Sequence, residues 1–422
     1  MISTYRRHTN LVFGVLLGLI LLVSSILTWA NYQYAVQNPG GNDFLVHWMG
    51  TRNLLLNNIS PYSDQTALDI QTMAYGRAAR PDEHQLRVAY PLYSIVLFAP
   101  FAFIEDFTLA RAVWMTLLEI CLVLISFILI NICEWKLNLF SLTTFLIFSL
   151  FWYHGLRPLI NGNAVIVITL LICLVILFIN NGNDEIAGVM LAFSTIKPQI
   201  ALVFFLFIMV WSWRQKRWNI MLWTFSTLAL LILTTTLMIP DWLWQNFLEV
   251  LRYPAYNPPG NLAAALLALL PGLGERLPWI VAGFLGIVLL IEWIVVRKQK
   301  DPKPFIWTAS ITLVISQWIG IQTDPGNFIL LMPALVLVLS ILETRWRWGK
   351  AISFLILLSL FVGLWVLFIQ TGTPGAQFQQ SPVMFLPLPG ILLILLYWVR
   401  WWVFRPPTVW FDEIESFYHL KK

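Results

Sequence analysis

Long apolar runs recur along the whole chain and constrain its fold more than any other feature. Twelve of them reach or approach the length of about 17–25 residues that a helix needs to cross a bilayer. They are residues 10–31, 89–104, 108–132, 138–152, 164–180, 186–212, 218–239, 279–296, 305–322, 327–342, 350–369 and 383–403. Only 11% of the residues are charged, against roughly 25% in soluble domains. The sequence therefore predicts an all-α polytopic membrane protein of about 12 transmembrane helices, with one domain over residues 1–403.

The first apolar run has two interpretations, a cleaved signal peptide or a retained helix. Arg6 and Arg7 precede it, as they would in either case. It spans roughly 20 residues, whereas the apolar part of a signal peptide has about 7–15. No small-residue cleavage pattern follows. We expect this segment to stay as the first transmembrane helix.

The distribution of positive charge predicts the orientation. With twelve spans and a cytoplasmic N-terminus, most of the 26 Lys and Arg residues fall on the cytoplasmic side, as the positive-inside rule requires. Arg111 and Arg157 are among them. Both termini, including a tail over residues 404–422, are then cytoplasmic in a plasma-membrane protein. The cations form no basic patch with interleaved aromatics, so nucleic acid is not an expected partner.

Two long segments face the outside in this topology. Residues 32–89, which we call loop A, join the first two predicted spans, and residues 240–278, which we call loop B, join the seventh and eighth. Loop A contains a helical pattern over Asp43–Leu56, and loop B contains two, over Trp242–Leu251 and Leu262–Leu270. Long ordered loops on a rigid scaffold are common places for functional residues. We expect the functional site there.

The start of the first loop A helix carries a possible general base. Asp43 follows a Gly40-Gly41 pair that allows a tight turn, and His47 lies one helical turn later on the same face. A partly desolvated carboxylate near an imidazole can accept a proton from a hydroxyl. The alternative is that Asp43 only complements the helix dipole.

Several motifs in order extend this interpretation. They are Asp43-Phe44, Trp48, Ser60-Pro61-Tyr62, Tyr90-Pro91, Ala99-Pro100, Asn161-Gly162-Asn163, Ala187-Gly188-Val189, Lys197-Pro198 and Gly260-Asn261-Leu262. Together with the two long loops, they resemble glycosyltransferase family 87. Its members are GT-C membrane enzymes related to polyprenyl-phosphate-mannose-dependent mannosyltransferases.

The resemblance implies a fold and a reaction. It implies a GT-C-like bundle with two large outer loops and an active site at the outer face, where an acidic loop residue, here Asp43, acts as base. A hexose, mannose by analogy with the family, would pass with inversion from a polyprenyl-phosphate donor to a glycolipid or glycan acceptor beside the membrane lipids. Some GT-C relatives use a divalent cation and others do not, so the resemblance leaves a cation open. No metal-binding residues are predicted.

Further residues are candidates for binding substrate or donor. Arg87 can present two parallel donors to a phosphate, or it can be an interfacial anchor. His47, Tyr90 and Asn261 lie in or beside the loop motifs. Lys197 falls in the middle of a predicted span, where a charge costs about 2.5–3.5 kcal/mol. A ligand contact, a buried partner or snorkelling toward the interface would each rationalise it.

Two departures from the family pattern bear on the activity. Family members often carry a Ser-Trp-x-His turn between the ninth and tenth spans, where this chain has Gln322-Thr323-Asp324-Pro325-Gly326-Asn327. Any part of that histidine in donor binding must then fall to Asp324 or Asn327, or be absent, and Asp324 is our candidate. Asn161-Gly162 stands where members usually carry Gly-Gln.

Two other function classes remain open. A transporter or flippase would place paired polar residues along several spans, and few are present apart from Lys197. A catalytically inactive scaffold of the cell envelope would be consistent with the missing histidine. We therefore predict a glycosyltransferase, with these two classes as alternatives.

Overall fold

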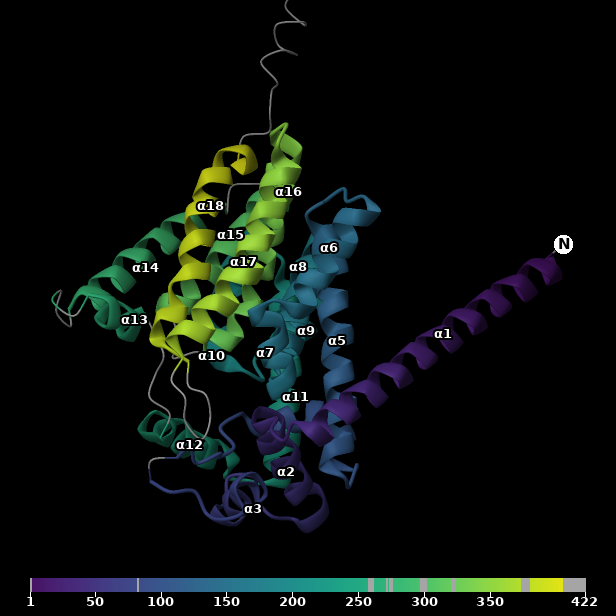
Figure 1. Ribbon diagram of the computed structural model, residues 1–422, viewed down its shortest axis with the longest axis vertical. Helices are drawn as coiled ribbons and strands as arrows, with labels where there is room; N and C mark the ends of the chain where they lie inside the picture. Colours follow the sequence, from purple (N-terminus) through teal and green to yellow (C-terminus); the bar gives the residue numbers. More distant parts are fainter. Residues whose placement is uncertain are drawn as a thin grey trace, which may run out of the picture. The chain divides into compact units, whose positions relative to one another are not determined.

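The computed structural model describes residues 2–404, except for 82, 257–261, 271, 273–275, 297–301, 320–323 and 373–379. The described residues form helices and no strand (Figure 1). The chain divides into two compact units. Unit 1 comprises Met1–Leu122, Arg157–Val167 and Leu231–Pro258, and unit 2 comprises Val123–Leu156, Ile168–Leu230 and Pro259–Lys422. The predicted tail lies outside the described residues, apart from Phe404.

Unit 1 contains four of the predicted site residues, Asp43, His47, Arg87 and Tyr90. Its elements are α1 (Ile2–Gln37), α2 (Asn42–Asn57), α3 (Asp64–Tyr75), η1 (Leu92–Ser94), α4 (Ile95–Ala102), the start of α5 (Phe107–Ile132), the end of α7 (Tyr153–Asn161), the start of α8 (Val165–Asn180), the end of α11 (Trp218–Met238) and α12 (Trp242–Tyr256). The first part of α1 runs away from the other helices of the unit (Figure 1). Its exposed leucines and isoleucines need a lipid environment.

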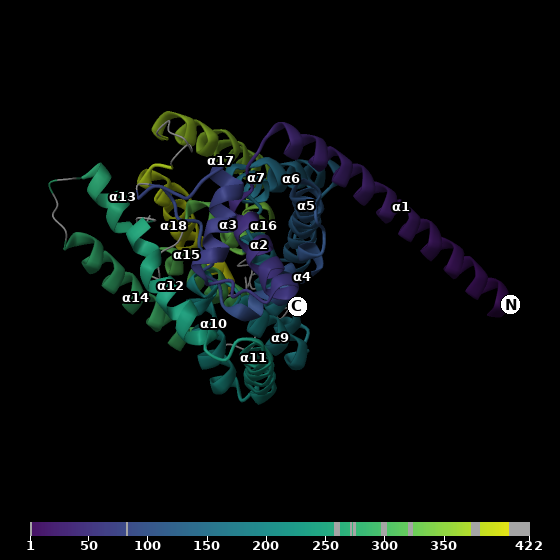
Figure 2. The ribbon, with the colours of Figure 1, turned by 90° about the horizontal axis from the view of Figure 1, so that it is seen from below.

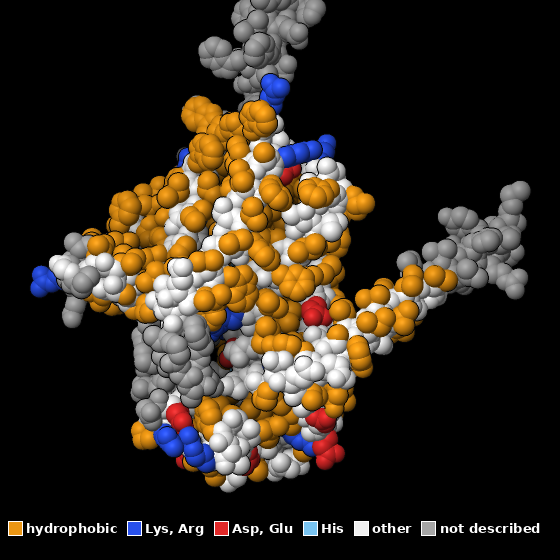
Figure 3. Space-filling view, in the orientation of Figure 1, with side chains coloured by type: hydrophobic (Ala, Val, Ile, Leu, Met, Phe, Trp, Pro, Cys, Tyr) orange, Lys and Arg blue, Asp and Glu red, His pale blue; other side chains and the backbone are white. Residues whose placement is uncertain are grey.

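Unit 2 is a helical bundle around two buried helices. Its remaining elements are α6 (Leu139–Phe151), α9 (Asp184–Ser194), α10 (Pro198–Gln215), α13 (Leu262–Leu269), α14 (Leu277–Val296), α15 (Pro302–Ile319), η3 (Pro325–Leu331), α16 (Met332–Arg345), α17 (Gly349–Thr371), η4 (Pro382–Phe385) and α18 (Pro387–Phe404). Almost all of α15 and α16 is buried. By contrast, α14 and α17 expose rows of large apolar side chains, part of the hydrophobic surface in Figure 3. Lipid is the solvent that suits such a surface.

The predicted all-α polytopic membrane fold is confirmed. Within the described residues, seven helices are long and apolar enough to cross a membrane, or eight if α6 and α7, which meet at a bend of 46°, form one span. The predicted helices of loops A and B are also present, as α2, α12 and α13. Four of the twelve predicted spans are not among these candidate spans. Two of the four correspond to single helices, α8 with 16 residues and α15, which fall short of that test, and the other two, over residues 89–104 and 186–212, are wrong as spans.

The predicted span over residues 89–104 is a short helix of unit 1. Helical structure starts only after Pro91, and α4 has eight residues, about 12 Å at 1.5 Å per residue. It packs on α2. From α2, Trp48 Nε1 donates to the carbonyl of Phe101 and Arg52 Nη1 to that of Ala102. Side chains of α2 therefore bind the last carbonyl groups of α4. An apolar run that packs on a loop helix does not cross a bilayer.

The predicted span over residues 186–212 is two helices of unit 2. Lys197 precedes Pro198, and proline disfavours helical geometry in the residue before it. Lys197 is accordingly the N-cap of α10, with φ −120° and ψ 77°, and not a mid-helix residue. Arg217, just beyond α10, donates to Asp184 at the start of α9 and to the carbonyl of Ile179. The chain therefore doubles back at Lys197.

The prediction that Arg111 and Arg157 are cytoplasmic contradicts the prediction that loop A is outside, because the structure joins their segments to loop A. Arg111 donates from Nη1 to the carbonyl of Asn38 in loop A, at 2.8 Å, and from Nη2 to that of Ile160. Arg157 lies on α7, about one turn before Asn161, whose side chain binds Asp43. No hydrogen bond crosses a hydrocarbon layer of about 30 Å. These segments therefore share one side of the membrane with loop A.

Candidate active site

Two glycines position Asp43 at the start of α2. Gly40 and Gly41 have φ of 147° and 79°, a backbone that favours glycine. Gly41 is also closely packed, because a Cβ there would lie 2.5 Å from Nε of Arg111. Asp43 is the acidic residue of the first turn of α2, where the helix dipole stabilises a negative charge. The predicted helix start is confirmed.

Two asparagines hold the Asp43 carboxylate. Asn161 Nδ2 and Asn163 Nδ2 donate to Oδ2 of Asp43 at 2.6 and 2.8 Å. The Asn163 amide is itself oriented, since its Oδ1 accepts from the backbone N–H of Val165 at the start of α8. Hydrogen bonds to an ionised acceptor are about twice as strong as neutral ones. The half-buried carboxylate is thereby fixed on one oxygen by two side-chain donors.

The turn between these asparagines fits tightly against α2. Gly162 has φ +70°, and a Cβ there would lie 2.5 Å from Cβ of Phe44, the residue after Asp43. Trp114 Nε1 donates to the Gly162 carbonyl at 2.8 Å. The Trp114 indole stacks on the Phe44 ring, with 5.4 Å between centroids. The backbone of residues 161–163 is thus held against the helix that carries the carboxylate.

His47 and Tyr90 lie close to each other and belong to the same region as Asp43. The His47 ring is buried between Tyr90 and Phe98, at centroid distances of 3.9 and 4.8 Å. Burial, followed by the negative charge of Asp43, raises the pKa of Tyr90 well above its ordinary value. Tyr90 is therefore a neutral phenol at physiological pH, with a hydroxyl hydrogen to donate.

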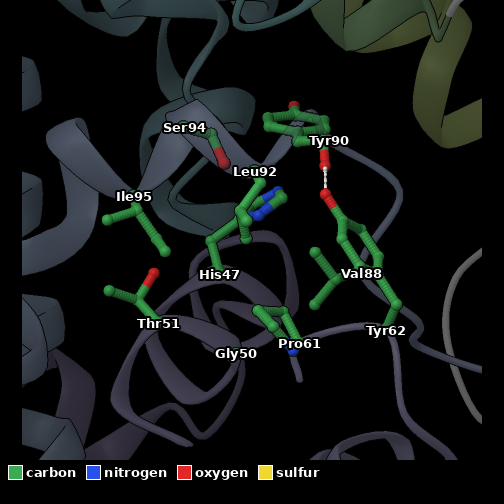
Figure 4. Close-up of a pocket in the computed structure, with 10 residues that line it drawn as sticks. All are labelled: His47, Gly50, Thr51, Pro61, Tyr62, Val88, Tyr90, Leu92, Ser94 and Ile95. Atoms are coloured by element: carbon green, nitrogen blue, oxygen red, sulfur yellow. Dashed lines mark hydrogen bonds between the residues drawn. The ribbon is translucent and has the colours of Figure 1, made fainter. Parts of the chain in front are cut away.

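A small cavity lies beside His47 in unit 1 (Figure 4). The Tyr62 hydroxyl closes one side of it by donating to the Tyr90 carbonyl at 2.7 Å. Its volume is about 10 Å³, roughly the space of one water molecule. A hexose is larger than this space, and the residues that line it come from loop A and from the segment that follows it, residues 90–95.

Arg87 is held by two carboxylates of very different exposure. Its Nε and Nη2 donate to the two oxygens of Glu249 on α12, at 2.7 and 3.0 Å, and Nη2 also donates to Asp64 at 2.7 Å. The Glu249 side chain is 2% exposed and that of Asp64 is 92% exposed. Burial lowers the pKa of Arg87, but the hydrogen bonds to Glu249 and Asp64 outweigh it and raise that pKa.

Unit 2 holds Lys197 and Asp324 in its own polar cluster. Lys197, only 4% exposed, donates from Nζ to Oδ1 of Asn327 at 2.6 Å. Asp324 caps η3 by accepting from the Gly326 N–H. It also accepts from Gln380 at 3.2 Å. A buried partner, one of the explanations considered for Lys197, is therefore present. Asn261 lies outside the described residues.

Sequence reasoning placed Asp43, His47 and Tyr90 in one region but did not identify Asn161 and Asn163 as its partners. The Asn161-Gly162-Asn163 motif supported the family resemblance, with Asn161-Gly162 as a departure from its pattern, but nothing in the sequence connected it to Asp43. In the described part of the chain, no group of three or more His, Cys, Asp or Glu side chains is arranged to hold a metal ion.

Comparison with known proteins gives one match. The family model described as glycosyltransferase family 87 matches residues 89–316, more than half of the chain. No curated protein and no solved structure matches. Tyr90, Asn161, Asn163 and Lys197 lie inside the matched stretch, and Asp43 precedes it.

Proposed function

Since the chain belongs to glycosyltransferase family 87, we propose that this glycosyltransferase moves a hexose from a polyprenyl-phosphate donor to a lipid or glycan acceptor, with Asp43 as general base. Mannose is the sugar that the resemblance to mannosyltransferases favours. The reaction would take place at the outer face of the plasma membrane. The observation that supports the proposal best is the pair of bonds from Asn161 and Asn163 to the Asp43 carboxylate.

The chemistry needs one base and a place for a leaving phosphate. The acceptor hydroxyl gives its proton to Asp43 while its oxygen forms a bond to the anomeric carbon. The bond from that carbon to the phosphate oxygen breaks on the opposite side, polyprenyl phosphate leaves with the electron pair, and the configuration inverts. A general base contributes typically about 10²–10⁴-fold to such a reaction. Held from one side by two amides, Asp43 needs little reorganisation to accept the proton.

Arg87 is our candidate for the donor phosphate. The buried Glu249 keeps the guanidinium in place, whereas Asp64 is almost fully exposed. Surface ion pairs contribute about 0–1 kcal/mol, so a phosphate can replace Asp64 without breaking the bond to Glu249. The substitution Asp64→Asn is then expected to leave donor affinity unchanged or to improve it, and Arg87→Gln to weaken it.

We propose donor-binding roles also for His47, Tyr90, Lys197, Asp324 and Asn261. Tyr90 supplies a neutral hydroxyl donor near Asp43. Lys197 supplies a buried ammonium group, which donates to Asn327 in unit 2. Lys197→Met is expected to raise the KM for the donor more than it lowers kcat.

The direct test uses full-length protein in lipid vesicles, supplied with a radiolabelled polyprenyl-phosphate sugar and a lipid extract. Asp43→Asn should lower product formation by about 10²-fold or more, with unchanged thermal unfolding. Glu105→Gln, an exposed carboxylate of the same unit, is the matched control and should keep full activity. Full activity in Asp43→Asn would show that another group is the base. Substrate counterflow without a covalent product would favour the transporter instead.

A further inference from the structure

The amphipathic helix α12 exposes its apolar side, whereas a surface helix of a water-soluble protein buries that side. Its large apolar side chains face outward, with exposed fractions between 46% and 61%: Leu243, Trp244, Phe247, Val250 and Leu251. Their spacing of three and four residues places them on one stripe of the helix. A contiguous apolar stripe of this size marks an interaction surface.

The polar side of α12 faces the protein and holds the end of loop A. Gln245 Oε1 accepts from the Ser60 hydroxyl at 2.6 Å. Asn246 Nδ2 donates to the carbonyls of Ala89 and Tyr90 at 3.1 and 3.0 Å. One turn further on, Glu249 binds Arg87. Each of these contacts joins α12 to residues between 60 and 90.

The chain before α12 fixes where this helix lies. The candidate span α11 ends at Met238, and α12 begins four residues later at Trp242. Trp242 Nε1 donates back to Oγ1 of Thr236, at 3.0 Å, which keeps the two ends together. Figure 2 shows α12 in a second view. The start of α12 is therefore held at the end of α11, where this candidate span would leave the bilayer.

We propose that α12 is a membrane-interface helix whose apolar stripe inserts at the boundary between headgroups and acyl chains. The partner is the phospholipid surface of the bilayer that α11 crosses. A short helix with one apolar face binds there with that face buried about 5–10 Å below the headgroups. Through Gln245, Asn246 and Glu249, α12 holds the end of loop A at a fixed depth. This inference concerns a lipid contact and is independent of the sugar-transfer proposal.

Spin-label accessibility tests the proposal on the full-length protein in phosphatidylcholine vesicles. Nitroxide labels are attached at Phe247→Cys and Leu251→Cys on the stripe, and at Gln65→Cys on the exposed side of α3 as the control. The unmodified protein gives the background from native cysteines. Collisions with oxygen, which partitions into lipid, are compared with collisions with a water-soluble nickel chelate.

The proposal predicts a ratio of oxygen to nickel collisions several-fold higher at residues 247 and 251 than at residue 65. A nickel accessibility equal to that of the control would place the stripe in water and overturn the proposal. Protection from both reagents would also overturn it, because a protein partner or a second copy would then cover the stripe. Two label positions one turn apart keep the test valid if one variant fails to fold.

Discussion

Replacing Gly162 by alanine tests how the candidate base is held. Gly162 has φ +70°, and its added Cβ would lie 2.5 Å from Cβ of Phe44. Ordinary contact between carbon atoms is about 3.5–4.0 Å, so α2 and the 161–163 turn would have to separate by about 1 Å. The left-handed backbone costs a residue with a Cβ about 1–2 kcal/mol, and overpacking costs about 1–3 kcal/mol.

A separation of that size would break the bonds to Asp43. The two bonds from Asn161 and Asn163 measure 2.6 and 2.8 Å, and lengthening by about 1 Å takes both past the usual limit for a hydrogen bond. A misplacement of about 1 Å can lower a rate about 10²-fold. We therefore expect Gly162→Ala to lower kcat about 10²-fold, with a smaller change in KM.

The control is Gly76→Ala in the same unit. Gly76 has φ +72°, but nothing lies within 4 Å of its added Cβ, so this variant carries the backbone strain without the clash. Initial rates of sugar transfer at saturating donor, together with thermal unfolding in the same vesicles, separate the two effects. Equal kcat losses in both variants, or normal kcat in Gly162→Ala, would refute the idea that the 161–163 turn positions Asp43 for catalysis.

Three further predictions concern loop A. Arg111→Met removes both bonds to the Asn38 and Ile160 carbonyls, so the unfolding temperature and kcat should fall together. Arg111→Lys has one nitrogen where Arg111 uses two, and should restore both quantities only in part. Glu249→Gln leaves Arg87 with a weaker partner and should speed hydrogen exchange in the residues between 60 and 90 that contact α12. The control Glu83→Gln, which changes the Arg77 ion pair, should leave the exchange of those residues unchanged. Burial lowers the pKa of His84, so the stability that the neutral imidazole contributes is present above pH about 6.5 and is lost as pH falls toward the lower folded pKa. Hydrogen exchange at the Leu86 N–H, which donates to His84 Nδ1, should accelerate in that pH range. Unchanged exchange there would contradict this prediction.

The sequence predicted the fold class and the loop helices because their signals are local. A glycine pair before Asp43 predicted the start of α2 within one residue, and apolar periodicity predicted α12 and α13. The two wrong spans had equally apolar runs. Pro91 and the Lys197-Pro198 pair could be seen to interrupt a helix. Hydropathy, however, depends on how long an apolar run is and not on what that run packs against.

The partners of Asp43 could not be found in the same way. Asn161 and Asn163 lie 118 and 120 residues further along the chain, and no local pattern connects them to it. Glu249 is 162 residues from Arg87, so sequence reasoning assigned Arg87 to a phosphate without seeing the carboxylate that holds it. Such pairs depend on tertiary structure, which cannot be inferred from a single sequence.

Loop A is held at both of its ends by later parts of the chain. Arg111 binds the Asn38 carbonyl before its first helix, and Asn161 and Asn163 bind Asp43 at the start of that helix. Helix α12 holds the last residues of the loop through Asn246 and Glu249. All of these holding residues lie within residues 89–316, the stretch that matches the family, whereas Asp43 and most of loop A precede that stretch. A catalytic group is effective when surrounding residues fix its geometry before the substrate arrives. The matched segment therefore contributes to the proposed reaction by positioning a base that it does not itself contain.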